Sequence, residues 1–221
     1  MGSARTNHAR DLVYKKNLEY SVLRFLDSLW FMKNFRKYAV EFLDVKPKQK
    51  VLDAGCGNGI LSVLVKKMHA DADVHAVDAS KYGIDIAVKN AKKQNLQIKF
   101  ATAPIEKIPF KKNYFDRILC SLVLHHIAHE NRMQALKELK RVLKPGGRML
   151  IVDIGKRSNI FSSLILWIIL KFAGKEEEHL AKDYSEGRLT GYIKYIKRAG
   201  FRNVRLAGKK FGFVDFLTAE K

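Results

Sequence analysis

The stretch Lys50-Val-Leu-Asp-Ala-Gly-Cys-Gly-Asn-Gly59 decides the fold of this chain. An apolar run ends inside it, three glycines follow at alternate positions from Gly55 to Gly59, and a second apolar run begins at Ile60. This order predicts a buried strand, a tight glycine turn and the first turn of a helix. Glycine allows a positive φ and the close approach of a ligand, and the helix start adds unpaired N–H groups with a partial positive charge.

Two acidic residues distinguish this turn from other glycine-rich loops. The G-x-G-x-G spacing differs from the G-x-G-x-x-G of the dinucleotide fingerprint. Asp53 precedes the first glycine by two positions, where a carboxylate would repel a pyrophosphate and suit a ligand with cationic groups. Asp78 ends a second predicted strand, Val74–Asp78, at the position that binds a ribose diol in nucleotide-binding α/β folds.

Together these motifs resemble the class I S-adenosylmethionine-dependent methyltransferases, whose first motif has the form VLDxGCGxG. The stretch Leu124-His125-His126-Ile127 and the stretch Leu139–Arg148, which is similar to the family's RVLKPGGR, extend the resemblance. It covers about residues 38–154 and continues weakly to the end of the chain.

The layout around the glycine turn narrows the resemblance to a subgroup. From Tyr20 through Trp30 and Arg36 into the turn, the chain looks like the quinone-biosynthesis C-methyltransferases, among the type 11 small-molecule and lipid methyltransferases. Phospholipid and sterol methyltransferases share much of the same pattern. The resemblance therefore implies S-adenosylmethionine as the cofactor and a small hydrophobic or lipid-like acceptor.

The expected fold is an α/β, Rossmann-like three-layer sandwich. The alternation of predicted strands and helices indicates a parallel sheet covered on both faces. The resemblance implies seven strands, mostly parallel, with the last strand antiparallel. We expect a single domain over 1–221, made of N-terminal helices (1–46), a cofactor-binding core (47–154), an apolar lid insertion (155–187) and a C-terminal helix with a strand hairpin (188–221).

Hydrophobic periodicity and stop signals predict the individual elements. Two basic amphipathic helices are expected over 11–45, packed on the sheet or lying on a membrane. Further helices are expected at 58–68, 81–94, 131–143 and 188–199, and strands from Lys50, at 73–78, 98–102, 115–121, 148–154, 202–208 and 211–219, the last two forming a hairpin.

Residues 155–187 interrupt this alternation. They include Ile160–Leu170, which is apolar nearly all round and, at about eleven residues, too short to span a bilayer. The segment follows the fifth strand, at the edge where open α/β sheets bind ligands. We expect this segment to form a lid over a hydrophobic substrate pocket, and we expect the lid to touch a bilayer. A plain core helix is the alternative.

The resemblance implies roles for residues along this edge. The turn from Asp53 to Gly59 would cradle the methionine part of the cofactor, and Asp78 would accept hydrogen bonds from the ribose hydroxyls. The alternative role for Asp78 is a helix N-terminal cap, which Ser80 could fill instead. The candidate cofactor-binding residues are Asp53, Gly55, Cys56, Gly57, Asn58, Gly59, Asp78, Ala79, Ile105, Ser121 and Leu122.

One departure from the family pattern concerns adenine. Many relatives carry a GDAExLPF stretch whose Asp binds the adenine amino group, but Pro104 occupies that place here. The backbone N–H of Ile105 could still reach adenine. Glu106 is a candidate substitute, although a solvated loop acid is the plainer interpretation.

His125 and His126 are the candidate catalytic residues. Methyl transfer from a sulfonium is an in-line displacement that positioning and desolvation accelerate, so a base is needed only for a phenol, a thiol or a carbon acid. The alternative is a loop histidine that packs or hydrogen-bonds locally. His129 lies nearby, but adjacent histidines usually cannot both face one ion, and no metal is expected.

Composition bounds the partners and the compartment. The formal charge of +20 predicts attraction to nucleic acid or to an anionic membrane, and solubility alone is an equally plain explanation. Two cysteines suit a reducing cytosol, and the polar start lacks a secretory signal. We therefore expect a cytoplasmic protein, with peripheral contact at the inner membrane face as an option.

Three functions remain open. The first is a methyltransferase for a quinone precursor or a phospholipid-type acceptor. The second is an RNA methyltransferase, prompted by the charge, although the fourth strand ends in Cys120-Ser121-Leu122-Val123 without the N/D-P-P-Y/F motif of base-amino methylation. The third is a non-catalytic cofactor-binding partner subunit. Neither the acceptor atom nor the oligomeric state follows from the sequence.

Overall fold

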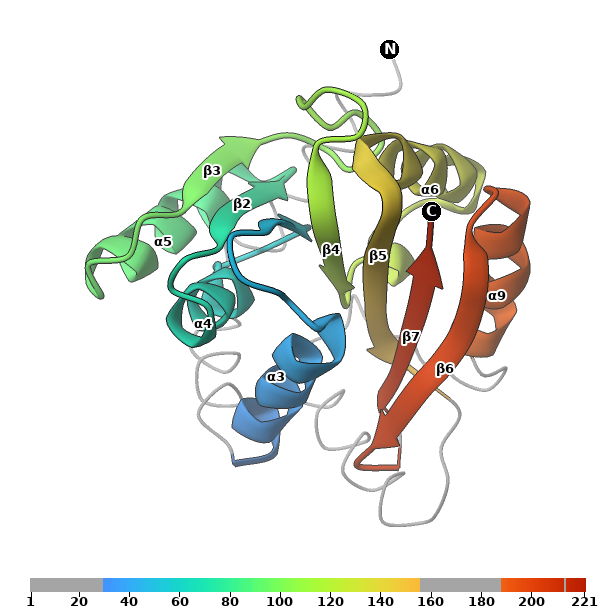
Figure 1. Cartoon of the computed structure of the whole chain (residues 1–221), viewed down its shortest axis with the longest axis horizontal. Helices are drawn as coiled ribbons and strands as arrows, with labels where there is room; N and C mark the ends of the chain where they lie inside the picture. Colours follow the sequence, from blue (N-terminus) through green and yellow to red (C-terminus); the bar gives the residue numbers. More distant parts are fainter. Residues whose placement is uncertain (1–29, 156–187, 213) are drawn as a thin grey trace.

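The structure, a computed structural model, describes residues 30–155, 188–212 and 214–221. Within them the strands form one seven-stranded sheet in the order β3-β2-β1-β4-β5-β7-β6 (Figure 1). The strands are β1 (Lys50–Ala54), β2 (Asp73–Asp78), β3 (Lys99–Thr102), β4 (Phe115–Ser121), β5 (Leu143–Ile154), β6 (Arg202–Lys210) and β7 (Val214–Glu220).

The pairing of the strands confirms the predicted fold class. Strands β1 to β5 pair in parallel, whereas β7 runs antiparallel to both of its neighbours, β5 and β6. The parallel strands therefore end at one shared edge of the sheet, which we call the carboxyl edge. The β6–β7 turn returns the chain to this same edge, because Ile154 and Val214 are register partners.

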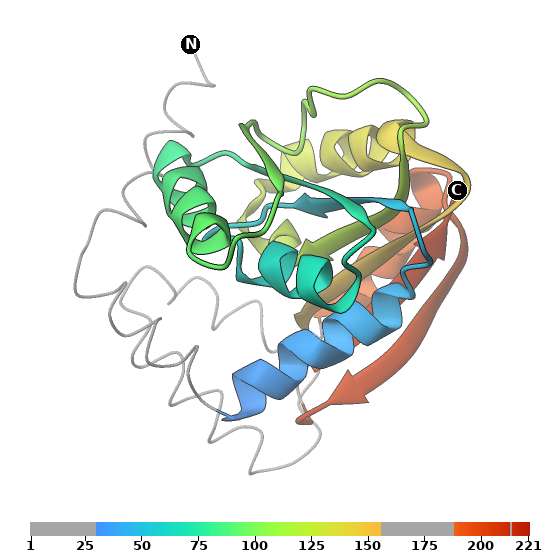
Figure 2. The same ribbon diagram turned by 60° about the vertical axis from the view of Figure 1, so that its left-hand side comes forward.

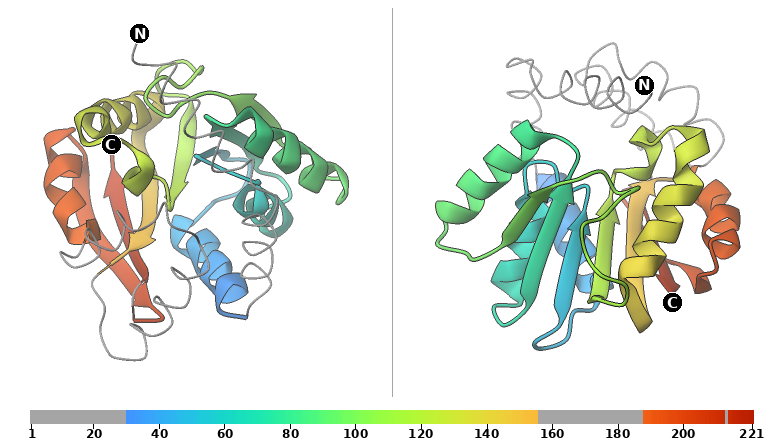
Figure 3. Two further views of the ribbon diagram at one scale, coloured as in Figure 1. Left: turned by 180° about the vertical axis from the view of Figure 1, so that it is seen from behind. Right: turned by 90° about the horizontal axis from the view of Figure 1, so that it is seen from above.

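Helices cover both faces of the sheet. Helices α3 (Trp30–Leu43), α4 (Ile60–Met68) and α5 (Lys81–Lys92) lie on one face (Figure 2). Helices α6 (His129–Val142) and α9 (Arg188–Arg198) lie on the other, as the view from above in Figure 3 shows. A short 3-10 helix, η1 (Leu124–His126), follows β4. The result is the three-layer arrangement expected from the alternation of elements.

Both faces of the sheet are apolar because successive side chains of a strand point to opposite sides. Val51 of β1 packs with Phe35 of α3 and with α4, whereas Leu52 packs into the cluster under α6 and α9. Both side chains are fully buried. A parallel strand covered on both faces reads as a continuous apolar run, which is why the sequence pattern located these strands well.

One predicted boundary is wrong. The fifth strand, expected over Arg148–Ile154, begins at Leu143 because this residue pairs with Phe115, and the register then shifts before Arg117 pairs with Arg148. The Lys-Pro-Gly-Gly run thus ends α6, as expected, and also lies in a bulged part of β5. The other described elements agree with their predicted ranges to within a few residues.

Two predicted segments lie mainly outside the described residues. The second N-terminal helix is present as α3, but the first falls in residues 1–29, and the lid insertion falls in residues 156–187. Among the described helices, none is both long and apolar enough to cross a membrane.

A buried histidine lies within the aromatic part of the core. His75 of β2 is surrounded edge-on by the rings of Phe110, Tyr114 and Phe115, with centroids 5.1, 5.6 and 5.4 Å away. Its Nε2 lies 3.1 Å from Oδ2 of Asp73. Burial lowers the pKa of His75, and the Asp73 carboxylate opposes this shift.

The His75 environment predicts a stability that falls in acid. Because the pKa of His75 is lower in the folded chain than in the unfolded chain, its contribution is present above about pH 6.5 and is lost as pH falls below it. We expect His75→Gln to cost about 1–3 kcal/mol of unfolding free energy at pH 8 and clearly less at pH 5. Urea unfolding at both pH values measures this difference.

The matched control is Phe110→Leu, which removes packing from the same cluster without removing a titratable group. Its cost should be the same at pH 5 and pH 8. A His75→Gln cost that grows in acid would contradict the assigned direction.

Candidate functional site

The glycine turn predicted from the sequence is a tight bend at the carboxyl edge. Gly55, Gly57 and Gly59 all have positive φ, at 79°, 52° and 72°. The amides of Gly55 and Cys56 both donate to the carbonyl of Val77 on β2, at 2.8 and 3.0 Å. Gly59 then caps the N-terminus of α4 in the left-handed conformation. We call residues Gly55–Gly59 the glycine bend; it joins β1, β2 and α4 at one point.

Two carboxylates flank the glycine bend. Asp53, only 2% exposed, accepts a hydrogen bond from the Ser62 hydroxyl at 2.5 Å. Asp78 accepts from the Gly57 amide through Oδ2 and from the Ser80 amide through Oδ1, both at 2.8 Å. Ser80 itself caps α5 by accepting from the Gly83 amide. The capping role considered for Asp78 therefore belongs to Ser80.

The electrostatics of this pair favour a cationic ligand. Burial raises the pKa of Asp53 to about 6, the Ser62 hydrogen bond opposes the shift, and the charge of Asp78 adds to it. A positive charge placed beside the two carboxylates would offset the desolvation cost of Asp53 and the repulsion between Asp53 and Asp78. This local negative site contrasts with the overall charge of +20.

Cys56 and Asn58 fill the positions between the glycines. Burial raises the pKa of the Cys56 thiol, and the charges of Asp53 and Asp78 raise it further, so the thiol stays protonated and unreactive at neutral pH. Asn58 Oδ1 accepts from the Ile60 amide at 3.3 Å and supports the start of α4. Both residues thus help to shape the glycine bend.

The end of β4 packs directly against the glycine bend. A Cβ built on Gly55 would lie 2.4 Å from Cγ2 of Val123. Leu122, with a φ of 56°, donates its amide to Val152 of β5, which is also the register partner of Ser121. The structure thus brings the predicted residues Ser121 and Leu122 beside the glycine bend.

The segment expected near adenine is tied to the end of β2. The Ala103 amide donates to the carbonyl of Asp78 at 2.8 Å, and the Ile105 side chain is buried in the core under α6. Ala79 lies half-buried next to Asp78. Glu106 is half-buried, with its Oε2 oxygen buried, so it is less exposed than the solvated loop acid that was expected.

The candidate catalytic histidines occupy different environments. The His125 side chain is 6% exposed, and its Nδ1 lies 2.9 Å from Oδ1 of Asp153 on β5, which is 1% exposed. His126 is exposed, and its ring lies 4.0 Å from the His125 ring, centroid to centroid. His129 turns away to hydrogen-bond Tyr195 of α9 at 3.0 Å. The rings of His125 and His126 are therefore neighbours in different environments, and His129 alone lies apart from them.

Asp153 was missed by the sequence analysis. A carboxylate that follows the apolar run Met149–Val152 at the end of a predicted strand is a signal that could have identified it. In the part of the chain that the structure describes, no three His, Cys, Asp or Glu side chains form a cluster suited to a metal ion.

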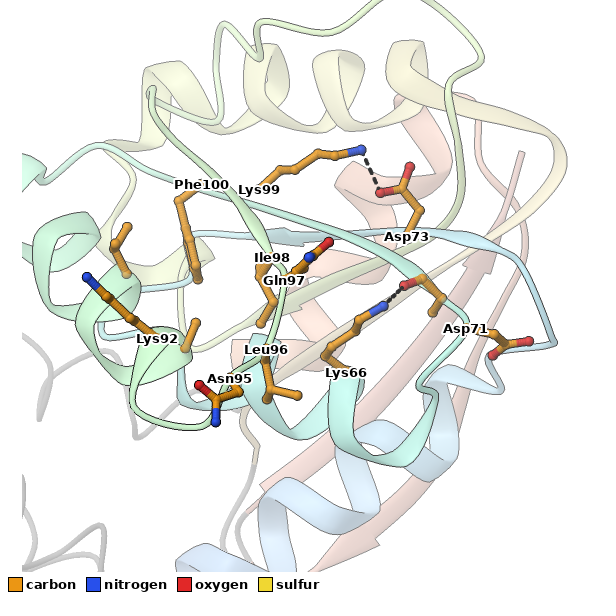
Figure 4. A pocket seen from close by; sticks show the side chains of 13 residues that line it. Lys66, Asp71, Asp73, Lys92, Asn95, Leu96, Gln97, Ile98, Lys99 and Phe100 are labelled. Atoms are coloured by element: carbon orange, nitrogen blue, oxygen red, sulfur yellow. Dashed lines mark hydrogen bonds and ion pairs between the residues drawn. The ribbon is translucent and has the colours of Figure 1, made fainter.

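A separate groove of about 820 Å³ runs along the edge strand β3, between α4 and α5 (Figure 4). Lys99 in it pairs with Asp73 at 2.9 Å, and Lys66 donates to the carbonyls of Ala70 and Ala72. Asp73 begins β2, so this groove reaches the end of the strand opposite the glycine bend. It is distinct from the candidate site.

Comparison with known proteins supports the predicted activity. Residues 52–151, a little under half of the chain, match the family model described as a methyltransferase domain, and this range begins and ends within the strands that carry Asp53 and Asp153. The chain is an S-adenosylmethionine-dependent methyltransferase. Its cofactor is S-adenosylmethionine, and the two carboxylates beside a glycine bend fit a ligand that carries a sulfonium, an ammonium and a ribose diol.

The curated relatives include quinone-biosynthesis enzymes. The methyltransferase is 26% identical, over 78% of its chain and 68% of the relative, to the ubiquinone/menaquinone biosynthesis C-methyltransferase of Bordetella avium. It is 26% identical to the demethylmenaquinone methyltransferase of Bacillus mycoides, over 96% of its chain and 94% of the relative. For the Bordetella parapertussis enzyme, the match spans 62% of the relative's length.

Solved structures share the fold of the methyltransferase. A methyltransferase from Aquifex aeolicus superimposes with a TM-score of 0.65 at 23% identity, covering 83% of this chain and 88% of the other. A phosphoethanolamine N-methyltransferase from Haemonchus contortus, in complex with phosphomonomethylethanolamine and S-adenosylhomocysteine, gives 0.69 at 16% identity, covering 95% and 59%.

The burial of Asp53 predicts that removing its charge raises the stability of the ligand-free enzyme and lowers its affinity for the ligand. Because its pKa is about 6 in the folded chain and near 3.9 in the unfolded chain, ionised Asp53 costs about 3 kcal/mol of stability once pH rises above 6. We expect Asp53→Asn to raise the melting temperature of the ligand-free enzyme at pH 8 but not at pH 4. Its affinity for S-adenosylmethionine should fall about 10-fold or more by calorimetry.

The control for this variant is Asp85→Asn, which removes an exposed carboxylate on α5. It should change neither the melting temperature nor the affinity appreciably. A loss of stability in Asp53→Asn at pH 8 would contradict the unfavourable burial assigned to this carboxylate.

Close packing of Val123 against Gly55 predicts that a methyl group added at Gly55 is more harmful than one added at a glycine in open space. Gly55 and Gly146 both have positive φ, at 79° and 72°, but a Cβ on Gly55 would overlap Val123 whereas one on Gly146 meets nothing within 4 Å. We expect Gly55→Ala to weaken S-adenosylmethionine binding at least 10-fold and to lower stability by about 2–4 kcal/mol. Gly146→Ala should cost only about 1 kcal/mol, with normal binding.

The double variant Gly55→Ala with Val123→Ala should recover part of the lost affinity, because it removes the two side-chain carbons nearest the new methyl group. If Gly146→Ala weakened binding as much as Gly55→Ala, overlap with Val123 would not be the cause.

Proposed function

We propose that this methyltransferase methylates a small hydrophobic acceptor of the quinol or lipid type. The observation that carries the proposal is the pair of carboxylates, Asp53 and Asp78, that flank the glycine bend at the ends of neighbouring strands. It supports a site for a cationic nucleoside. A polar contact between His125 and Asp153 lies at the ends of β4 and β5, and β4 is the direct neighbour of β1 in the sheet.

Each predicted residue has a role in this proposal. Asp53 and the glycine bend would orient the amino-acid part of the cofactor, and the Asp78 carboxylate would accept hydrogen bonds from the ribose hydroxyls. Ala79 and the Ile105 amide would border the adenine ring, and Ser121 and Leu122 would limit the site on the β4 side. When bound, S-adenosylmethionine supplies an electrophilic methyl group on a sulfonium.

The chain's own contribution to the reaction is positioning, exclusion of water and, for an acidic acceptor, removal of a proton. Two histidines follow β4, and either His125 or His126 is proposed to take that proton. The buried Leu124 and the half-buried Val123 limit water on the β4 side.

The acceptor class rests on sequence similarity. The relatives that match across most of the chain are named for ubiquinone or menaquinone biosynthesis or as a demethylmenaquinone methyltransferase, and these names support an acceptor of the quinol type. The charge of +20 would draw the enzyme to an anionic membrane surface. Peripheral contact with the inner membrane face is therefore part of the proposal.

The charge also supports a second candidate, an RNA methyltransferase. A third candidate, a cofactor-binding partner subunit without activity of its own, follows from Pro104 in place of the family's adenine-binding acid. Neither candidate explains the buried His125–Asp153 contact at the carboxyl edge.

Transfer of a labelled methyl group distinguishes these functions. We expect the purified enzyme to transfer a tritiated methyl group from S-adenosylmethionine to demethylmenaquinol in detergent micelles. We expect it to label neither tRNA nor ribosomal RNA. Asp53→Asn should lower the rate at limiting cofactor by about 10-fold or more. Label in RNA alone, or in none of the three, would contradict the proposal.

A flotation assay tests the membrane contact. We expect the intact chain to float with vesicles containing one-third phosphatidylglycerol at low salt, and less at 0.5 M salt, because the Debye length shortens. Leu166→Glu with Ile169→Glu, in the apolar stretch, should weaken flotation. No binding to the anionic vesicles at low salt would remove membrane contact from the proposed function.

A further inference from the structure

Four polar side chains form a row across the carboxyl edge of the sheet, which we call the charged row: His125, Asp153, Asp215 and Lys209. His125 Nδ1 lies 2.9 Å from Asp153 Oδ1, and Lys209 Nζ lies 3.2 Å from Asp215 Oδ1. Asp153 and Asp215 are register partners on β5 and β7, and Lys209 on β6 is the register partner of Asp215. Directly opposed residues of antiparallel strands share a face, so the row is continuous.

We propose that Asp153 is the positioning residue that makes His125, not His126, the proton acceptor of the reaction. The proposal rests on the proposed function and narrows its acceptor class. The acceptor would be a compound that must lose a proton on methylation: a phenolic or quinol O–H, or the carbon that such a group makes acidic.

The contact with Asp153 sets the tautomer of His125. An ionised carboxylate only accepts hydrogen bonds, so Nδ1 must carry the proton and Nε2 keeps its lone pair. The two side chains come from separate strand ends, 28 residues apart in the chain, and both are nearly fully buried. His126 is exposed, where water competes for its nitrogens.

The acceptor, the cofactor and His125 together account for the proton and the electron pairs of the methyl-transfer step. The nucleophilic atom of the acceptor forms its bond to the methyl carbon while the carbon–sulfur bond breaks and its electron pair stays on sulfur. The proton of the acceptor passes to Nε2 of His125. The resulting imidazolium lies beside the Asp153 carboxylate and is stabilised by it.

The other carboxylate of the charged row has a different partner. Asp215, 2% exposed, has its cation in Lys209, whose Nζ lies 3.2 Å from Oδ1. Asp153 instead contacts the His125 imidazole. An imidazolium formed at His125 would therefore lie beside a carboxylate, which favours the protonated product.

Asp215 provides a matched control for Asp153. Both are buried carboxylates at the same level of the sheet, but Asp215 pairs with Lys209 and not with the histidine. If Asp153 only held the 3-10 turn in place, then replacing either carboxylate would reduce stability and activity alike. If Asp153 positions His125, only Asp153→Asn should change the histidine.

Nitrogen chemical shifts test the proposal without an acceptor. In the full chain labelled with ¹⁵N-histidine and bound to S-adenosylhomocysteine, we expect the Nδ1–H tautomer at His125, assigned by its loss in His125→Gln. Asp153→Asn should convert a measurable fraction to Nε2–H, because an amide can donate as well as accept. Asp215→Asn should keep the Nδ1–H tautomer. An Nε2–H tautomer of His125 in the native chain would overturn the proposal. So would an Nδ1–H tautomer that stays unchanged in Asp153→Asn.

Steady-state kinetics with demethylmenaquinol give the second readout. We expect Asp153→Asn and His125→Gln each to lower kcat by about 10²–10⁴-fold, with KM and the Kd of S-adenosylmethionine within about threefold of native values. The double variant should lose little more, because the two residues act as a unit. His126→Gln should lower kcat far less than His125→Gln, and Asp215→Asn far less than Asp153→Asn; an equal loss within either pair would overturn the proposal.

The two readouts separate the proposal from the proposed function. If the native enzyme labels only RNA, or labels neither demethylmenaquinol nor RNA, the proposed function fails. The tautomer of His125 then decides alone whether Asp153 positions it.

Discussion

The burial of Asp53 beside the glycine bend is the constraint on which the rest of the site depends. An ionised carboxylate that is 2% exposed and near a second acid costs stability unless a cation compensates it. The bend is nevertheless held by well-defined contacts, from Gly55 and Cys56 to Val77 and from Gly57 to Asp78. The ligand-free chain thus keeps an unfavourable charge in place, and a sulfonium nucleoside is the ligand that would relieve it.

The carboxyl edge divides the chemistry between two halves of the sheet. The ends of β1 and β2 carry the carboxylates that suit a cation, and the ends of β4, β5, β7 and β6 carry the charged row. Val123 joins the halves, because it packs against Gly55 and directly precedes η1. A shift of Val123 would therefore affect the cofactor side and the histidine side together.

Local patterns in the sequence predicted the parts of the fold that depend on local chemistry. The glycine bend, the cap at Ser80 and the apolar strands each follow from neighbouring residues, and all were found. The early start of β5 at Leu143 was missed because it depends on pairing with Phe115. Asp153 was missed for the same reason: its partner, His125, lies on another strand's end, and spacing along the chain does not encode that contact.

Proton release on binding tests the central claim most directly, because it reports the ionisation of Asp53 itself. Calorimetric titration of S-adenosylmethionine at pH 6, in buffers of different ionisation enthalpy, gives the number of protons exchanged. Since the pKa of Asp53 is about 6 in the free enzyme, the account predicts release of up to about half a proton per ligand, much less at pH 8, and none at pH 6 in Asp53→Asn. Binding without proton release at pH 6, or equal release by Asp53→Asn, would contradict it.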